Sequence, residues 1–297
     1  MGDLTLHDDP AHDSAMGGLV QRLVHHRFFG EYDDHDRAVV AAQQMLERTA
    51  DRLTLVRVHL DGVERGHVWL RADGDDVGVL DLTLDDHTLA PGVRDLLVER
   101  ATTAGRTRLT VGVVPGDPVL GAFATGGGFD VAAYQMRLPL DDRIPAEDAL
   151  VLVPMDENTF APYMARGNEE YAEARAKAGE SPERAREVAE TQTAELLPDG
   201  LATAGHHFFV GEVDGERVGT LWLGTERPMA FVYDVVVDEA RRREGHGAGL
   251  MRAGAVYARE QGAHALGLNV FGYNHGAKAL YDRLGYSVVE EYAARTL

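Results

Sequence analysis

The pattern of apolar and polar residues in the second half of the chain predicts strands that alternate with helices. Ala230–Val237 is a strongly apolar run of strand length, and Ala265–Phe271 is a second one. Ser181-Pro182-Glu183 has the residue types of a helix start, with an N-cap followed by proline. We expect helices near 156–178, 181–197, 246–261 and 275–284, and further strands near 150–154, 207–213, 217–224 and 286–293. Strands and helices mixed in this order predict an α/β fold of the α+β type, with a mixed sheet.

An Asp-Gly pair between two alternating apolar runs predicts a tight hairpin, and the chain contains this pattern twice. Asp61-Gly62 and the Trp69-Leu70 pair are followed 153 positions later by Asp214-Gly215 and Trp222-Leu223. The two tryptophans are the only ones in the chain. Each copy is therefore interpreted as strand, turn, strand.

The same offset continues beyond the hairpin, which predicts an internal repeat. Asp81, Asp85 and Gly92 match Asp234, Asp238 and Gly245 at that offset. After a four-residue length difference, further turn residues match at an offset of 157, with Asp117 against Asn274, Gly128 against Gly285 and Phe129 against Tyr286. We infer two copies of one domain, 1–143 and 144–297, joined by the acidic segment at 141–145.

Composition limits the classes of function. The formal net charge of −20 argues against a nucleic-acid partner, and it favours a cationic partner such as an amine or reflects only a solubility trait. The absence of cysteine excludes disulfides and thiolate sites. No apolar run is long enough for a membrane span, and the acidic start does not resemble a signal peptide, so we expect a cytoplasmic protein, as a monomer or homodimer.

The segment 235–250 carries the first candidate chemistry. The apolar strand ends in Val235-Val236-Val237, and a turn with Gly245 and Gly247 then begins a helix. Free N–H groups at a helix N-terminus bind phosphate, and glycines allow a close approach of the ligand. The three arginines at 241–243 form the only such basic run in this acidic chain. A glycine turn that merely permits tight packing is the competing interpretation.

Two nucleotide-binding alternatives do not fit this loop. A nicotinamide-binding Gly-x-Gly-x-x-Gly normally begins its domain and is followed by further parallel strand–helix units. A phosphate-loop NTPase needs a Gly-Lys-Ser/Thr sequence, which the chain lacks.

A second motif makes the assignment specific. Asn274-x-x-Ala277-x-x-Leu280-Tyr281-x-x-x-Gly285-Tyr286 follows the strand 265–271. Together with Arg242-x-x-Gly245-x-Gly247, it resembles the two signature blocks of the GCN5-related N-acetyltransferase (GNAT) superfamily. The resemblance covers about 206–297 closely, and the repeat makes the chain similar to tandem members of that superfamily.

The resemblance implies acetyl-CoA as cosubstrate, held in a cleft between two splayed strands. Backbone groups of Val235, Val236 and Val237 would contact the pantetheine arm, with one of these N–H groups polarising the thioester carbonyl. Asn274 would bond the pantetheine amide region, although a helix cap is its alternative role. Tyr281 would protonate the leaving thiolate as general acid, with core packing as its alternative. The pyrophosphate would be held by the loop residues Arg242, Arg243, Glu244, Gly245, His246, Gly247 and Ala248.

The general base is the point at which the sequence departs from the family. Many members have a carboxylate eleven residues before the motif arginine, where this chain has Phe231. Tyr233 shares the face of Phe231, whereas Asp234 should point the other way unless a β-bulge redirects it. Our catalytic candidates are Tyr281 and Asp234, and the other candidate bases are a water chain and helix acids. The residues expected near the acceptor are Phe231, Tyr233, Glu170 and Tyr171, and the helix acids considered as bases are Glu169, Glu170 and Glu173. A solvated helix face is the alternative for these acids.

The first copy lacks the same machinery. Leu89 and Arg94 stand where the second copy has Arg242 and Gly247, and Pro91 removes one N–H from the loop. Asp117 replaces Asn274, and Ala124 replaces Tyr281. We therefore expect a degenerate, non-catalytic first domain. The alternative is that this domain still binds CoA without catalysing a reaction.

The leading hypothesis is an acetyl-CoA-dependent N-acetyltransferase that acts on a primary amine of a small molecule by direct attack on the thioester. The alternatives are a protein or peptide amine acetyltransferase and a non-catalytic acyl-CoA-binding sensor. His206 and His207 lack a third ligand at metal spacing, so we expect no metal site.

Overall fold

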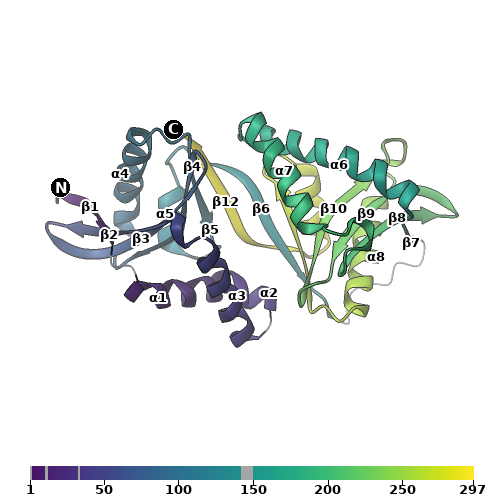
Figure 1. Cartoon of the computed structure of the whole chain (residues 1–297), viewed down its shortest axis with the longest axis horizontal. Coiled ribbons are helices and arrows are strands. Elements are labelled where there is room, and N and C mark those ends of the chain that lie inside the picture. Colours follow the sequence, from purple (N-terminus) through teal and green to yellow (C-terminus); the bar gives the residue numbers. More distant parts are fainter. Residues whose placement is uncertain (1, 11–12, 33, 142–149) are drawn as a thin grey trace. The chain divides into compact units, whose positions relative to one another are not determined.

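The computed structural model describes residues 2–10, 13–32, 34–141 and 150–297. The chain forms two compact units, which we call unit 1 (residues 1–134 and 288–297) and unit 2 (residues 135–287). Each unit consists of one sheet with helices on both faces (Figure 1). The mixed α/β fold expected from the sequence is confirmed.

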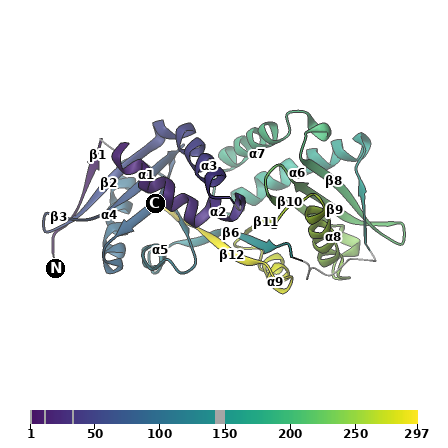
Figure 2. The same ribbon diagram turned by 90° about the horizontal axis from the view of Figure 1, so that it is seen from below.

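Unit 1 has the strand order β1-β2-β3-β4-β5-β12. The pairs are antiparallel except for β4 with β5, which run parallel. Helices α1–α3 pack on one face around buried Trp69, whereas α4 and α5 pack on the other face around Phe123 (Figure 2). The elements are β1 Leu4–Asp9, α1 Asp13–Leu23, a π-helical turn Val24–Phe28, α2 Phe29–Tyr32, α3 His35–Arg48, β2 Leu53–Leu60, β3 Val63–Asp73, β4 Asp76–Leu84, α4 Ala90–Thr103, β5 Arg108–Val113, α5 Pro118–Ala124 and β12 Ser287–Thr296.

Unit 2 has the strand order β6-β11-β10-β9-β8-β7. Leu250 of α8 packs beneath Gly211 and Gly219 on one face, and α6 covers the other face with Phe160 and Tyr163 against Phe208. The elements are β6 Asp130–Pro139, β7 Val151–Pro154, α6 Glu157–Lys177, α7 Pro182–Leu196, β8 His206–Val213, β9 Glu216–Gly224, β10 Met229–Val237, α8 His246–Glu260, β11 Ala265–Phe271 and α9 His275–Arg283.

The internal repeat appears in the structure at the offsets read from the sequence. The first residues of β2, β3 and β4 lie 153 positions before those of β8, β9 and β10. Both hairpin turns place Asp and Gly in the left-handed region, with φ of 51° and 78° at Asp61-Gly62 and 53° and 79° at Asp214-Gly215. Positive φ at both central residues is the geometry that a two-residue hairpin prefers.

The two compact units are divided differently from the two sequence copies. The C-terminal half of β6 belongs to unit 2 although it ends the first copy, and most of β12 belongs to unit 1 although it ends the second. β12 pairs with β5 from Glu291↔Val113 to Thr296↔Arg108, and Leu140 after β6 donates to the carbonyl of His264 before β11. Each sheet is therefore completed by the last strand of the other copy. The segment at 142–149, which the sequence suggests as a joint, lies outside the described residues.

Candidate active site

Two parallel strands of unit 2 separate and leave part of the backbone of β10 without a sheet partner. β10 and β11 pair from Met229↔Ala265 to Val232↔Leu268, and no pairing of these strands follows in the described chain. On its other edge β10 stays paired with β9 as far as Val237↔Gly219. The segment 233–237 therefore presents unpaired backbone groups towards β11, as the cleft expected for the pantetheine requires. Val235, Val236 and Val237 all lie on this segment and are half-buried.

A β-bulge on β10 changes the direction of Asp234. Val232 faces Leu223 and Asp234 faces Trp222, so Tyr233 is the extra residue on its strand. The ring of Tyr233 stacks on Trp222 at 4.8 Å, on the face that α6 covers. Asp234 points to the same face, because its Oδ2 accepts a 2.8 Å hydrogen bond from the hydroxyl of Tyr163 on α6. The bulge thus satisfies the condition under which the sequence allowed Asp234 to reach the site.

The environment of Asp234 favours its protonated form. Burial raises the pKa of its carboxyl, and the charge of Glu170 adds to the increase, while the hydrogen bond from Tyr163 acts in the opposite direction. Burial and the neighbouring carboxylate also raise the pKa of Tyr163 well above its ordinary value. Asp234 is therefore a carboxylate with increased proton affinity, which is what a base for an ammonium substrate needs.

Tyr281 lies on α9, within the electrostatic range of Asp234. It is 7% exposed, and burial, with a further contribution from Asp234, raises its pKa to about 12. Its ring lies 5.7 Å from that of Tyr286. Tyr281 therefore keeps its proton at neutral pH and can donate it. Its packing agrees with the core role considered from the sequence, and its role as general acid stays a prediction.

The turn before α8 has the geometry of an anion-binding site. Gly245 is the N-cap of α8 with φ 91°, and Arg243 also has positive φ, at 68°. No backbone N–H from Arg243 to Gly247 donates to another backbone group of the described chain, whereas Ala248 donates to Gly245. A Cβ on Gly247 would lie 3.3 Å from Leu280, so this position has little space for a side chain. The loop therefore fits a pyrophosphate.

Side chains of the loop hold its shape. The Nε of Arg242 donates to the carbonyl of Val237 at 3.4 Å. Arg241 donates to Glu244 at 3.1 Å, and Glu244 also lies 3.0 Å from the Nε2 of His246. These bonds lower the pKa of Glu244. Three of the residues expected at the pyrophosphate thus contact one another or the end of β10.

Asn274 is the N-cap of α9. Its Oδ1 accepts from the backbone N–H of Ala277 at 3.2 Å, the capping role that the sequence left open. The side-chain amide N–H groups are not used in this cap, so the pantetheine role stays a prediction.

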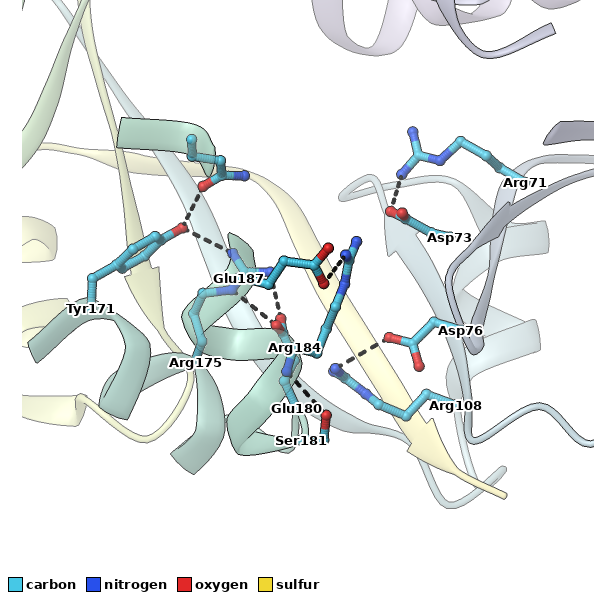
Figure 3. A network of polar contacts seen from close by, with 11 residues as sticks. Arg71, Asp73, Asp76, Arg108, Tyr171, Arg175, Glu180, Ser181, Arg184 and Glu187 are labelled. Carbon is cyan, nitrogen blue, oxygen red and sulfur yellow. Dashed lines mark hydrogen bonds and ion pairs between the residues drawn. The ribbon is translucent and has the colours of Figure 1, made fainter. Parts of the chain in front are cut away.

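Of the expected acceptor residues, Glu170 has its charge near Asp234, and the other three lie elsewhere on unit 2. Tyr233 donates to Glu226 at 2.9 Å, and the ring of Phe231 packs against it. Tyr171 lies further along α6, where Arg175 donates to its hydroxyl at 2.9 Å (Figure 3). Arg175 also pairs with Glu180 at 2.6 Å, so Tyr171 belongs to a network between α6 and α7.

Tyr163 was not predicted from the sequence. It lies in no motif, and the only signal for it is that a tyrosine falls on the predicted helix 156–178 that covers the sheet. The charge of Glu170, one of the helix acids considered as a base, raises the pKa of both Asp234 and Tyr163. Within the described ranges, no group of three or more His, Asp or Glu side chains is placed to hold a metal ion.

Unit 1 contains the same strand geometry, occupied by two arginines. β4 and β5 pair only from Asp76↔Arg108 to Val79↔Val111, and a bulge precedes Asp81, the repeat equivalent of Asp234. Arg22 of α1 forms ion pairs with Asp81 and with Asp117, the latter at 3.4 Å, and also donates to the carbonyl of Leu82.

The second arginine lies where the repeat has Gly247. Arg94 is 8% exposed and donates to the carbonyl of Thr125 at 3.0 Å. Asp117 caps α5 as Asn274 caps α9. The helix-capping function is thus conserved between the copies, whereas the cleft is filled by side chains.

Comparison with known proteins gives the same assignment. The model of the Acetyltransferase (GNAT) family matches residues 169–286. The uncharacterized N-acetyltransferase YycN of Bacillus subtilis is 31% identical over 154 residues, which cover 50% of this chain and 99% of that protein. A mycothiol acetyltransferase of Thermobispora bispora is 30% identical over 180 residues, covering 57% of this chain and 59% of that protein.

A solved tandem structure has the same architecture. The tandem GNAT protein from the clavulanic acid biosynthesis pathway aligns with a TM-score of 0.50 and 22% identity, over 99% of this chain and 98% of that one. This similarity shows the fold only. The assignment as an N-acetyltransferase rests on the relatives found by sequence. No helix in the described part of the chain is long and apolar enough to cross a membrane. The chain belongs to the GNAT family and is an N-acetyltransferase with a tandem arrangement of GNAT folds.

Proposed function

We propose that unit 2 transfers an acetyl group from acetyl-CoA to a primary amine of a small molecule. The observation that carries the proposal is the pair of proton-handling side chains at the separated strands of unit 2. Asp234 has a raised pKa on the face that α6 covers, and Tyr281 on α9 lies close enough for its pKa to be affected by the charge of Asp234. One group can accept the proton of an ammonium, and the other can supply one to a leaving group.

The residues present fit acetyl-CoA. The free N–H groups from Arg243 to Gly247 would hold the pyrophosphate, and the unpaired backbone of Val235–Val237 would hold the pantetheine arm. The cosubstrate supplies an acetyl group activated as a thioester. Nothing else in the mechanism requires chemistry from outside the chain.

In the proposed mechanism, Asp234 accepts a proton from the incoming ammonium group, so that the neutral amine can attack the thioester carbonyl. A backbone N–H of the segment 235–237 polarises that carbonyl, and Tyr281 donates its phenolic proton to the departing sulfur. A new C–N bond replaces the C–S bond, and the products are an amide and CoA. As the amide forms, the attacking nitrogen loses a second proton, which restores the phenol of Tyr281. The proton on Asp234 goes to solvent.

The size of the adjacent pocket supports a small acceptor over a protein or peptide. An open pocket of about 290 Å³ is lined by Tyr163, the residue that hydrogen-bonds Asp234, and by neighbouring residues of α6. This volume is close to the lower end for small-ligand sites. A sensor without catalysis would not need the Asp234–Tyr281 arrangement.

The test is a panel of primary amines, scored by release of free CoA from acetyl-CoA and by mass of the product. Turnover of at least one small amine, lost in Asp234→Asn, is the expected result. Failure to bind acetyl-CoA in calorimetry would overturn the proposal. Turnover confined to protein or peptide amines would replace the acceptor class.

A further inference from the structure

A pocket of unit 2 lies beside the proposed base. It is lined by six residues, five from the first half of α6 and one from β9, namely Asn158, Thr159, Pro162, Tyr163, Arg166 and Arg217. Tyr163 connects it to the chemistry, because the same side chain forms part of the wall and bonds Asp234 at 2.8 Å. A ligand in this pocket would therefore contact Tyr163, the residue that hydrogen-bonds the proposed proton acceptor Asp234.

The charged side chains that line the pocket are both arginines. The chain as a whole has 49 acidic and 29 basic residues. The pocket lining, with two guanidinium groups and no carboxylate, therefore has the opposite sign of charge to the chain as a whole. Arg217 is held in place by Asp238, which accepts from its Nε at 3.0 Å and from its Nη2 at 3.5 Å. Asp238 leads into the turn before α8, so this arginine is attached to a structured part of the site.

Arg166 is held more weakly. Its Nε lies 3.4 Å from Glu170, and the two side chains are 48% and 57% exposed. An exposed ion pair of this kind contributes little to stability, so an anionic ligand can compete for the guanidinium. The charge of Arg166 also reaches Asp234 and Tyr163, where it lowers both pKa values. Arg166 therefore lines the pocket within electrostatic range of Asp234.

Guanidinium groups recognise carboxylates and phosphates through paired N–H donors. Asp234 already provides the negative group that an ammonium needs. A second cationic group on the acceptor would be repelled by the two arginines of the pocket. We propose that the pocket is an acceptor subsite for an acidic group, and that the substrate class is a small primary amine bearing a carboxylate or a phosphate, bound by Arg166 and Arg217. This inference deepens the proposed function and rests on it.

The experiment compares matched amines that differ only in the acidic group. Suitable pairs are ethanolamine with phosphoethanolamine, glucosamine with glucosamine 6-phosphate, and an amino acid with its amide. Release of CoA is measured across acceptor concentrations with saturating acetyl-CoA. We expect kcat/KM to be at least about tenfold higher for the acidic member of a pair that is turned over, the factor of one good charged contact.

Variants identify the residues responsible. Arg166→Gln and Arg217→Gln should each raise KM for the acidic amine about tenfold, and should change KM for its neutral partner much less. The assay is run well above the acidic limb of the pH profile, because the charge of Arg166 also lowers the pKa of Asp234. Arg217→Lys should recover less than the wild-type affinity, because lysine cannot form the paired contact. Arg186→Gln, on the exposed surface of α7, is the matched control. An unchanged Kd for acetyl-CoA shows that the loss of the Asp238 contact has not disturbed the adjacent turn.

The outcomes separate the two proposals. Equal kcat/KM for acidic and neutral amines, with both arginine variants unaffected, would overturn the acidic subsite while the acetyltransferase assignment stands. A higher kcat/KM for the member without the acidic group would overturn it as well. Absence of acetyl-CoA binding would instead remove the proposed function on which the inference depends.

Discussion

Tyr163 donates a 2.8 Å hydrogen bond to Asp234 and thereby connects α6 to the bulge on β10. Burial raises the pKa of the Asp234 carboxyl, and it outweighs the lowering by Tyr163 and by the backbone N–H of Val235. A charged carboxylate at such a position destabilises the fold, since the folded state holds its proton more tightly than the unfolded chain does. The proposed role of Asp234 as proton acceptor would explain why this destabilising residue is present.

Asp234→Asn should therefore separate activity from stability. Turnover should fall about 100-fold or more, because the proton acceptor is gone. The free energy of unfolding at pH 7 should rise. A raised folded-state pKa stabilises the fold only at low pH, and this stabilisation is lost as the pH increases through the folded pKa. Asparagine has no charge at pH 7, so the destabilisation by the ionised carboxylate is absent from the variant. Steady-state kinetics and denaturant unfolding at pH 4 and pH 7 measure both effects. A variant that is both inactive and less stable at pH 7 would contradict the assignment.

Tyr163→Phe should move the pH dependence of catalysis. The hydrogen bond from Tyr163 lowers the pKa of Asp234, so its removal should raise that pKa further. The acidic limb of kcat/KM should then shift to higher pH, with a rate within about threefold of wild type well above the limb. Tyr171→Phe is the matched control on the same helix, since Tyr171 bonds Gln192 and Arg175. A shift of the same size in both variants would exclude the specific contact.

Tyr281→Phe should reduce kcat about 100-fold while the Kd for acetyl-CoA changes less than about threefold, because the phenol acts only on the departing sulfur. With a pKa of about 12, Tyr281 should show no loss of its proton below pH 10. Tyr286→Phe is the control, since its buried hydroxyl has no hydrogen-bond partner among the described residues. That variant should keep full activity and equal or greater stability. Comparable losses in the two variants would indicate that packing is responsible.

The repeat could be read from the sequence because turn residues are conserved in type where φ must be positive. The Asp-Gly turns at 61–62 and 214–215 and the matched glycines Gly128 and Gly285 are examples. The β-bulge on β10 could be considered only as a possibility from the sequence, because no residue type indicates a bulge. Once it is known, the direction of Asp234 follows from the period of two along a strand.

Side-chain contacts between distant elements could not be read in the same way. Tyr163 meets Asp234 across 71 positions, and Arg22 meets Asp81 across 59, with no local pattern at either end. The exchange of β6 and β12 between the units could not be predicted from the sequence either. Two homologous last strands have the same alternation, so sequence alone does not decide which sheet each one completes.

Gly247→Arg should abolish acetyl-CoA binding. A Cβ at this position would already lie 3.3 Å from Leu280 and 3.5 Å from Val237, and a longer side chain would enter the space beside the free N–H groups of the turn. Gly247→Ala is the graded control, with an expected loss of less than about tenfold because only one methyl group is added. Calorimetry measures both, and circular dichroism verifies the fold. Unchanged affinity in Gly247→Arg would refute the assignment of the loop.

Arg22→Ala tests whether unit 1 is a filled and passive copy of the site. Removal of the guanidinium leaves the enclosed carboxylates of Asp81 and Asp117 without their cation, which should lower the free energy of unfolding by about 2 kcal/mol. Wild-type protein should bind one acetyl-CoA per chain, because Arg22 and Arg94 occupy the cleft of unit 1. The variant should also bind one, since Arg94 and Pro91 remain, and its kcat should equal that of wild type. The double variant Arg22→Ala/Asp81→Asn should recover part of the lost stability. Two equivalents of acetyl-CoA bound to the wild-type chain would show that unit 1 has kept a working site.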